Sequence, residues 1–284
     1  MARYSDLDKR MKGYYEEIPK IKLMRRTPVI IRLDGKAFHT FTRGFQKPFD
    51  DILISSMQDT MKYLCENIQG CVLGYTQSDE ITLILVDYKK LNSSAWFDYE
   101  VQKMCSISAS MATMAFNKAF HEEYYKWGIE NLPNFDMGGT NEPVDESIIN
   151  LSQVYDRAAN RGAMFDSRVF NIPKEEVTNC LFWRQDDASK NSIQMVGQAN
   201  FSHKELQGKS CNDIQNMLLT ERGINWNDLP TYKKRGSCCI KENYEVCVDG
   251  VVTTRSHWVI DNDIPIFKGE CREYIERLIN FEVS

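Results

Sequence analysis

The sequence of 284 residues has only four histidines, no Cys-x-x-Cys pair and no long apolar run. No apolar stretch approaches the roughly 20 residues that a helix needs to cross a bilayer, so we expect no membrane span. The first residues are charged and lack the apolar core of a secretory signal peptide, which favours a cytoplasmic location. With 42% hydrophobic and 26% charged residues, the composition is ordinary for a soluble protein.

Nine cysteines are present, but their number is odd and their spacing is irregular. This pattern argues against a disulfide framework, and the lack of histidine near any cysteine pair argues against structural zinc. We expect reduced and mostly buried thiols. Cys238 and Cys239 are adjacent, but neighbouring residues of a strand point to opposite faces, which disfavours a redox pair.

An excess of positive charge is also missing, since the net charge is −5. This excludes a protein coated in positive charge for nucleic acid, although local patches remain open. Basic residues cluster in 22–26 and again at Lys233, Lys234 and Arg235. Acidic residues concentrate in 122–146 and 261–276. A surface with one basic side is therefore an open prediction.

The apolar residues that are present follow a β-α-β-β-α-β pattern. Residues 27–33 are rich in β-branched side chains, and 50–70 have the apolar spacing of an amphipathic helix. Residues 71–88 are two apolar runs around a polar turn, which predicts a hairpin. A helix is expected at about 99–127 and a strand at 163–172. This order is typical of a ferredoxin-like α+β fold, an antiparallel sheet with two helices on one face.

The remaining segments predict additions to that core. Residues 131–147 are rich in Pro, Gly and Asn and predict a surface excursion. After Pro173 the pattern is mainly helical to about 222, followed by a β-hairpin around Asp249-Gly250 and a final helix after Pro265. We expect one unit over 1–284, with a core at about 25–173 and a helical and hairpin elaboration at about 174–284.

Acidic residues stand at two matching ends of the predicted sheet. Asp34 ends the first strand, and Asp79 and Glu80 lie at the hairpin turn. In a ferredoxin-like sheet the first and third strands are antiparallel neighbours, so these carboxylates can meet. Mg²⁺ is typically held by one or two carboxylates together with substrate phosphates. Two such ions, about 4 Å apart, serve phosphoryl and nucleotidyl transfer.

Gly35 has a use in such a site. It lets the backbone turn so that its carbonyl can join the metal ligands, while the amides of 35–39 face a triphosphate. The alternative is that Asp34-Gly35 is only a turn and that 77–80 are only a hairpin tip. The occurrence of both at matching ends of one sheet favours the metal site.

Five motifs together resemble the tRNA-His guanylyltransferase family, which includes the Thg1-like proteins. The resemblance covers roughly residues 20–242, and its motifs read in order RLDGKAFHTF, GYTQSDEITLIL, FDSRVFNIP, FWRQDDASKNSIQM and LPTYKKRGS. It implies a polymerase-palm fold used in the reverse direction, adding nucleotides 3′ to 5′ at the 5′ end of a tRNA. It also implies a homotetramer built as a dimer of dimers.

The resemblance implies roles for individual residues. Metal ligands would be Asp34, Asp79 and the carbonyl of Gly35, and Glu80 would support the catalytic pair. Contacts with the nucleotide triphosphate would come from Asp34, Gly35, Lys36, Ala37, Phe38, His39, Ser78 and Asp79, with Arg32, Lys47 and Arg168 suited to phosphates. Lys47 could equally be a solvated lysine. His39 is expected as a phosphate or base contact and not as a catalyst. Weaker RNA contacts would come from Lys233, Lys234 and Arg235.

One segment departs from the family pattern. Members that add guanosine at position −1 of tRNA-His read H-I-N-N-L-Y-N where this chain reads SKNSIQM at 189–195, so only Asn191 is retained. The departure favours the Thg1-like branch, whose members resemble template-dependent enzymes that repair 5′-truncated tRNAs.

The expected reaction has two parts. ATP activates a 5′-monophosphate end by adenylylation, or an existing 5′-triphosphate is used. The 3′-hydroxyl of an incoming ATP, GTP or other NTP then attacks that end, assisted by two Mg²⁺ ions. Alternatives are guanosine addition at position −1, another palm-type nucleotidyltransferase or cyclase, and a binding module without activity.

Overall fold

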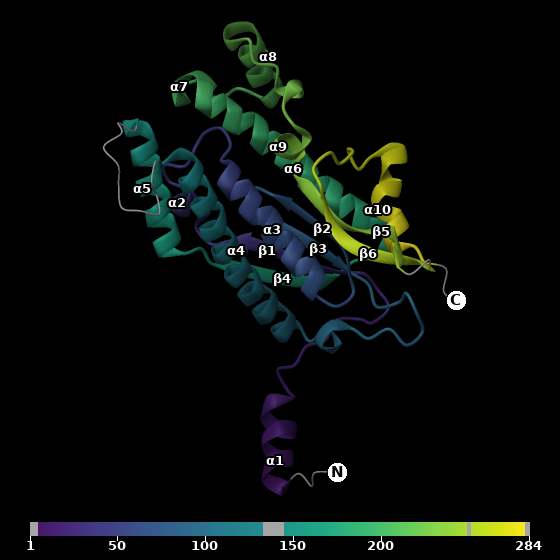
Figure 1. The fold of residues 1–284 in the computed structure, drawn as a ribbon. Coiled ribbons are helices and arrows are strands. Elements are labelled where there is room, and N and C mark those ends of the chain that lie inside the picture. Colours follow the sequence, from purple (N-terminus) through teal and green to yellow (C-terminus); the bar gives the residue numbers. More distant parts are fainter. Residues whose placement is uncertain (1–4, 133–144, 249–250, 282–284) are drawn as a thin grey trace.

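The computed structural model describes residues 5–132, 145–248 and 251–281. Its centre is a six-stranded sheet in the order β4-β1-β3-β2-β5-β6, in which every neighbouring pair is antiparallel (Figure 1). The strands are β1 (Val29–Gly35), β2 (Cys71–Gln77), β3 (Glu80–Leu85), β4 (Phe165–Asn171), β5 (Ser237–Val248) and β6 (Val251–Asp261).

The predicted β-α-β-β-α-β order is confirmed. Helix α3 (Asp51–Asn67) joins β1 to β2, and α4 (Val101–Asn131) follows β3. Asp50 starts α3 by accepting a hydrogen bond from the Leu53 amide at 3.0 Å. A further helix that was not predicted, α5 (Glu146–Arg161), precedes β4, and most of the predicted excursion at 131–147 lies outside the described residues.

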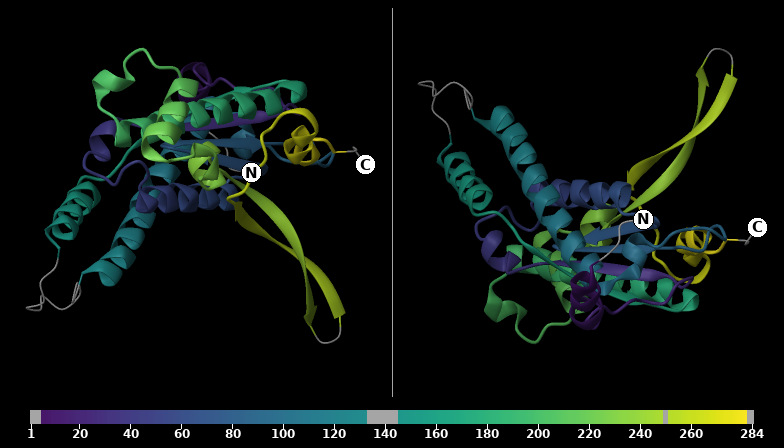
Figure 2. Two further views of the ribbon diagram at one scale, coloured as in Figure 1. Left: turned by 90° about the horizontal axis from the view of Figure 1, so that it is seen from above. Right: turned by 90° about the horizontal axis from the view of Figure 1, so that it is seen from below.

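The sheet is covered on both faces. Helices α3 and α4 lie on one face, as predicted, while α6 (Lys174–Asn200) and α10 (Glu273–Ile279) lie on the other (Figures 1 and 2). Strand alternation creates the two layers, because Leu33 and Ile81 face α3 and α4 whereas Ile30 and Ile84 face α6 and α10. The second layer is the expected C-terminal elaboration.

The adjacent cysteines Cys238 and Cys239 lie on β5. Cys239 packs in the layer with α3 and α4, and Cys238 packs in the layer with α6 and α10, so the two thiols point to opposite faces as predicted. All nine cysteines are free. The expectation that most are buried is wrong, because three are buried, four are half-buried and Cys247 and Cys271 are exposed.

The C-terminal region matches its predicted pattern. After α6 come α7 (His203–Leu206), α8 (Cys211–Arg222) and α9 (Thr231–Arg235). Strands β5 and β6 form the predicted hairpin, which extends beyond the sheet as an arm (Figure 2), while its turn residues lie outside the described part. Within the described residues, no helix is long and apolar enough to span a bilayer. The organisation as one unit stays a prediction.

The N-terminal helix α1 (Asp6–Met11) and the π-helical turn after it, η1 (Lys12–Glu16), lie away from the rest of the molecule (Figure 1). The sequence pattern did not predict them, since their side chains are exposed and carry no core-facing stripe.

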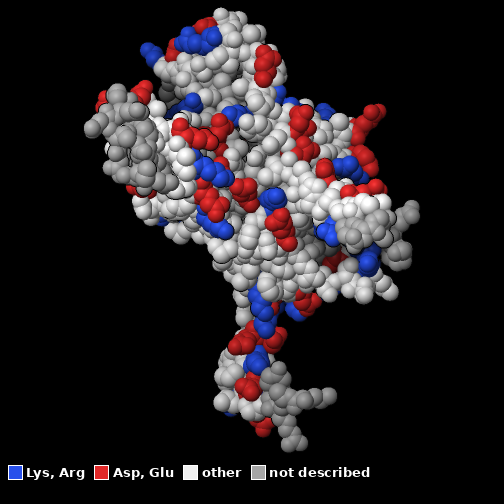
Figure 3. Space-filling model, viewed as in Figure 1, with Lys and Arg blue, Asp and Glu red and all other residues white. Residues whose placement is uncertain are grey.

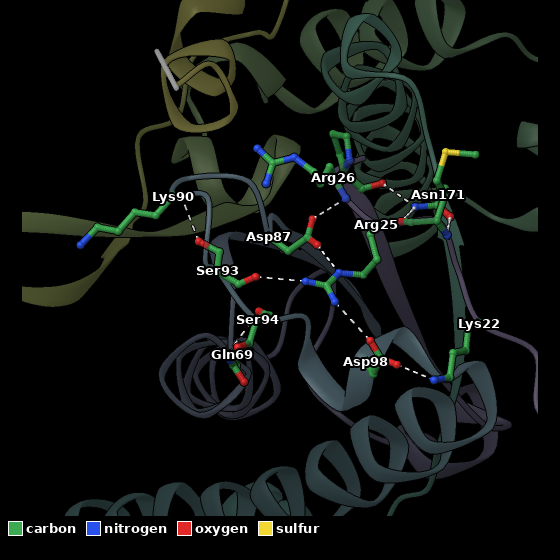
Figure 4. A network of polar contacts seen from close by, with 12 residues as sticks. Lys22, Arg25, Arg26, Gln69, Asp87, Lys90, Ser93, Ser94, Asp98 and Asn171 are labelled. Carbon is green, nitrogen blue, oxygen red and sulfur yellow. Dashed lines mark hydrogen bonds and ion pairs between the residues drawn. The ribbon is translucent and has the colours of Figure 1, made fainter. Parts of the chain in front are cut away.

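A polar network fixes the segment that enters β1 (Figure 4). The Arg25 guanidinium donates to Asp87 Oδ2 at 2.5 Å and to Asp98 Oδ1 at 3.2 Å, and Lys22 also pairs with Asp98. Two of the three basic residues in 22–26 are thus neutralised by acids. On the face drawn in Figure 3, charges of both signs are interspersed. This face therefore does not show the one-sided basic surface that the sequence left open.

Candidate active site

The structure brings together the two acidic positions that the sequence singled out. Asp34 at the end of β1 stands directly opposite Glu80 at the start of β3, and Ser78 and Asp79 form the turn beside them. The Gly35 amide donates to the Asp79 carbonyl oxygen at 3.0 Å, which ties the end of β1 to that turn. The predicted meeting of Asp34 and Asp79 follows from this register.

The surroundings of Asp79 disfavour the ionised form of its carboxylate. Burial raises its pKa above the ordinary aspartate value, and the neighbouring charge of Asp34 raises it further. A hydrogen bond from Ser78 Oγ to Asp79 Oδ1, at 3.0 Å, acts in the opposite direction. Among the described residues, the cation within ion-pair distance of Asp34 is Arg168, whose Nη2 lies 4.0 Å from Asp34 Oδ2. An added cation would therefore relieve the repulsion between the two acids.

The donor atoms fit a hard cation. The described residues contain no group of three or more His, Cys, Asp or Glu side chains that could hold a metal ion. Asp34, Asp79 and the carbonyl of Gly35 offer oxygen only, which suits an ion that keeps water and substrate phosphate as its other ligands. This donor set is consistent with Mg²⁺ and unlike a structural zinc site.

Glycine is required at position 35, for a reason beyond the predicted turn. A Cβ at this position would lie 2.2 Å from Cδ2 of Phe38, whose ring packs directly over the backbone. Phe38 is buried and contacts the rings of Phe41, Phe116 and Phe165. Phe38 therefore anchors the loop after β1 in the core.

Glu80 has a different role from the aspartates. The Arg184 guanidinium donates to its two oxygens at 2.6 and 2.7 Å, and both side chains are about 10% exposed. Burial raises the pKa of Glu80, and the bonds from Arg184 act against that rise. Both oxygens of Glu80 are thus occupied by Arg184, and its supporting role stays a prediction. Arg184 itself was not predicted, although it lies in the FWRQ motif.

A cavity of about 500 Å³ opens beside the aspartates. That volume lies in the range of small-molecule sites. Eight of the predicted residues line it, namely Asp34, Gly35, Ala37, Phe38, His39, Lys47, Ser78 and Asp79. The sequence did not predict eight others, Thr42, Phe45, Gln46, Pro48, Asp50, Leu53, Met195 and Gln198.

The backbone after β1 only partly matches the expected row of amides. The Gly35 and Lys36 amides donate to carbonyl oxygens of Asp79 and Met164, so they are not open to a ligand. Ala37 has a φ of 54°, which turns the chain into the short helix α2 (Phe38–Phe41). Within the described chain, the amides of 37–39 have no acceptor and remain available.

Three predicted phosphate contacts lie outside this cavity. Lys36 is exposed and does not line it. Arg32 shares a face of β1 with Asp34 but lies two residues back, about 7 Å along the strand. Arg168 stands opposite Arg32 on β4. The two arginines therefore belong to the open surface on the other side of Asp34.

A smaller cavity of about 90 Å³ adjoins the first and is lined by Lys233 and Lys234. Lys233 Nζ lies 2.6 Å from Asp51 Oδ1, and Lys234 Nζ donates to the Asn227 carbonyl oxygen at 2.5 Å. Burial lowers the pKa of Lys234. Internal partners thus occupy both lysines that were predicted to contact RNA, whereas Arg235 has no acidic partner among the described residues.

Comparison with known proteins gives matching evidence. The family model described as tRNAHis guanylyltransferase matches residues 8–143. A bacterial tRNA(His) guanylyltransferase (Thg1)-like protein, solved in complex with ATP, superposes with a TM-score of 0.76 and 42% identity over 97% of this chain and 100% of that chain. The similar bacterial complex with GTP gives a TM-score of 0.73 and 39% identity over 98% of this chain and 100% of that one.

A relative from Drosophila melanogaster, named probable tRNA(His) guanylyltransferase, is 25% identical over 75% of this chain and 67% of its own length. The order of the motifs, the palm-like sheet with its paired aspartates and the full-length match to the bacterial proteins agree with one another. The chain therefore belongs to the tRNA(His) guanylyltransferase family, among its Thg1-like proteins, and is a nucleotidyltransferase.

Proposed function

We propose that this protein adds nucleotides in the 3′-to-5′ direction to the 5′ end of a tRNA, copying the opposite strand, and so repairs 5′-truncated tRNA. The observation that carries the proposal is the pair Asp34 and Asp79 at the rim of a cavity of about 500 Å³. That volume accommodates one nucleoside triphosphate. The bacterial relatives solved with ATP and with GTP support such a ligand.

Two Mg²⁺ ions are the cofactor of this reaction in our proposal. When bound, they neutralise phosphate charge and lower the pKa of the attacking hydroxyl. Asp34, Asp79 and the carbonyl oxygen of Gly35 would hold them. Glu80 and Arg184 keep the start of β3 in place beside that pair, because their two hydrogen bonds are buried.

The cavity supplies the contacts for the incoming nucleotide. Lys47 is exposed at its rim and has no carboxylate within ion-pair distance in the described chain, which suits a phosphate. Ala37, Phe38 and His39, whose amides have no acceptor in the described chain, line the same cavity. These groups hold the triphosphate while its ribose 3′-hydroxyl attacks the RNA 5′ end, with release of AMP or pyrophosphate.

Residues 189–195 of helix α6 support the template-dependent form of the reaction. Ser189 stands where members that add guanosine at position −1 carry histidine, and its Oγ donates to the Gln185 carbonyl oxygen at 2.9 Å, within its own helix. Ser192 and Met195, two further changed residues of the same segment, line the cavities. The changed residues thus lie at the proposed site, where they can alter which RNA end is accepted.

One assay tests the proposal. The protein is incubated with Mg²⁺, labelled NTPs and a tRNA that lacks its first nucleotide, with each of the four bases in turn at the opposing position. We expect extension by the complementary nucleotide in each case. Guanosine addition whatever the opposing base would support the tRNA-His reaction instead. A cyclic nucleotide formed without RNA, or no turnover, would reject the repair function.

Asp79→Ala should abolish extension while the protein stays folded. Asp186→Ala is the control, because Asp186 is an acid of α6 that does not line the cavity and, within the described part of the chain, pairs with Lys190 alone. A large loss of Tm in Asp79→Ala would show that the acid is structural. We further propose a cytoplasmic homotetramer, which light scattering on the purified protein and localisation of a tagged chain would test.

A further inference from the structure

Trp183 is an aromatic side chain that the reaction described above does not use. It lies on α6 and is 54% exposed, although tryptophan is usually largely covered. The guanidinium carbon of Arg184 lies 4.7 Å from its ring centroid, and that of Arg32 lies 5.7 Å from it. The ring is thus held beside two cationic groups on the face of the sheet that carries Asp34.

The arginines near this ring differ in whether an acidic side chain neutralises them. Arg184 is neutralised by Glu80 and Asp187. Arg32 has no carboxylate within ion-pair distance among the residues the structure describes. Arg168 is 54% exposed and lies 4.0 Å from Asp34 Oδ2 and 3.7 Å from Asp166 Oδ1, which are loose contacts. Two guanidinium groups therefore remain available for an anion.

The register makes these two arginines an unusual pair. Arg32 on β1 and Arg168 on β4 stand directly opposite each other in neighbouring strands. Like charges at such positions are destabilising because the side chains lie close on one face. An anion between them would remove that cost. The pair therefore points to a phosphate ligand, two residue pairs away from Asp34 along the strands.

This surface is distinct from the cavity, and Asp34 borders both. Asp34 lines the cavity, yet it also lies beside Arg168. Trp183, Arg32 and Arg168 do not line the cavity. A reaction that joins a nucleotide to an RNA end needs two substrates on either side of the reacting atoms. If the cavity holds the nucleotide, the open surface is left for the RNA.

We propose that Trp183 is a stacking platform for the nucleobase at the 5′ end of the acceptor RNA, beside the arginines that face its terminal phosphates. This inference rests on the proposed function. Aromatic stacking tolerates every base, because each base has a π-face, and contributes about 1–3 kcal/mol per base. An enzyme that copies a template needs this kind of contact, since the RNA end differs from one substrate to the next.

The kinetic test compares Trp183→Ala, Trp183→Phe and Phe97→Ala. Phe97 is the control because it is also an exposed aromatic residue, at 42%. It lies next to Asp98, which pairs with Arg25 before the start of β1, whereas Asp34 lies near the end of that strand. Trp183→Ala should raise the KM for a 5′-activated truncated tRNA roughly 5- to 150-fold, which corresponds to 1–3 kcal/mol. The KM for the NTP should stay unchanged, and Trp183→Phe should restore most of the loss.

A binding measurement separates this inference from the proposed function. An acceptor-stem RNA with 2-aminopurine at its 5′ end should lose fluorescence on binding the wild-type protein and Trp183→Phe, but keep it with Trp183→Ala. Equal quenching in all variants would overturn the platform even if extension follows the template. A change of oligomeric state in Trp183→Ala, with RNA binding intact, would also overturn it. Failure of extension with Trp183-dependent quenching would reject only the repair reaction.

Discussion

Tyr155→Phe tests the polar contact beneath the cavity by removing a single oxygen atom. Tyr155 of α5 is 1% exposed, and its hydroxyl donates to Asp50 Oδ2 at 2.7 Å. The same carboxylate accepts the amides of Leu53 and Gln46, both at 3.0 Å. Asp50 thus starts α3, lines the cavity and is buried at the same time.

The expected cost is that of one hydrogen bond to a charged group. Such bonds contribute about 1.5–3 kcal/mol, against about 0.5–1.5 for a neutral pair. Packing should not change, because the ring of Tyr155 keeps its contacts with Phe45, Phe120 and Trp127. We therefore expect Tyr155→Phe to lower the free energy of unfolding by about 1.5–3 kcal/mol at neutral pH.

The loss should depend on pH in a defined direction. Burial raises the pKa of Asp50 above its ordinary value of 3.8, and the bond from Tyr155 opposes that rise. A raised pKa in the folded state means that ionising Asp50 costs folding free energy, a cost absent below 3.8 and complete above the folded-state pKa. The variant enlarges this cost, so its deficit is largest at neutral pH and shrinks as the pH falls toward 3.8.

Urea unfolding between pH 7.5 and about pH 4 measures the effect, with Tyr88→Phe as the matched control. Tyr88 is also buried, and its hydroxyl donates to the Ile279 carbonyl oxygen at 3.1 Å, an acceptor that does not titrate. The control should lose about 0.5–1.5 kcal/mol at every pH. Equal deficits in the two variants, or a Tyr155→Phe deficit that does not change with pH, would refute the reasoning.

Two further substitutions test the contacts that hold strands β2 and β3 in place next to the aspartates. Arg184→Met leaves the buried carboxylate of Glu80 without its cationic partner and should cost about 3–5 kcal/mol, seen as a fall in Tm of roughly 6–20 °C. Adding Glu80→Gln should recover most of this loss. Gly236→Ala places a Cβ 2.3 Å from the Thr76 carbonyl oxygen at a φ of +82°, so its Tm should fall well below that of Gly208→Ala, where φ is +76° and the space is open.

The core of the fold could be predicted because its signals are local. The β-branched run of β1 and the apolar spacing of α3 report burial directly. The strand order then places Asp34 opposite Glu80 without further information. Helix α5 was missed although Leu151, Val154, Tyr155 and Ala158 have a helical spacing that carried the same signal. Helix α1 buries no side chain, so its sequence has no apolar spacing from which a helix could be predicted.

The rest of the site depends on contacts between distant segments. Arg184 lies 104 positions from Glu80 along the chain, and no spacing rule connects them. The sequence predicted Lys233 and Lys234 as RNA contacts, because the partners that occupy them, Asp51 and Asn227, become their neighbours only after folding. Arg32 was predicted as a phosphate contact, but its position outside the cavity, beside the ring of Trp183, depends on where α6 crosses the sheet.

Residues 189–195, which depart from the family pattern, lie on α6, whereas the two aspartates lie on the sheet. The choice of substrate can therefore change without a change in the chemistry. Along α6, Val196 is buried away from the cavities, whereas Asn191, Ser192, Met195 and Gln198 lie on the side of the helix that lines them. Met195 borders both cavities with a flexible apolar side chain. Substitutions on this face change the wall and leave Asp34 and Asp79, which sit on the sheet, in place. Activity after Asp79→Ala therefore reports on the chemistry, and the response to the opposing base reports on this wall.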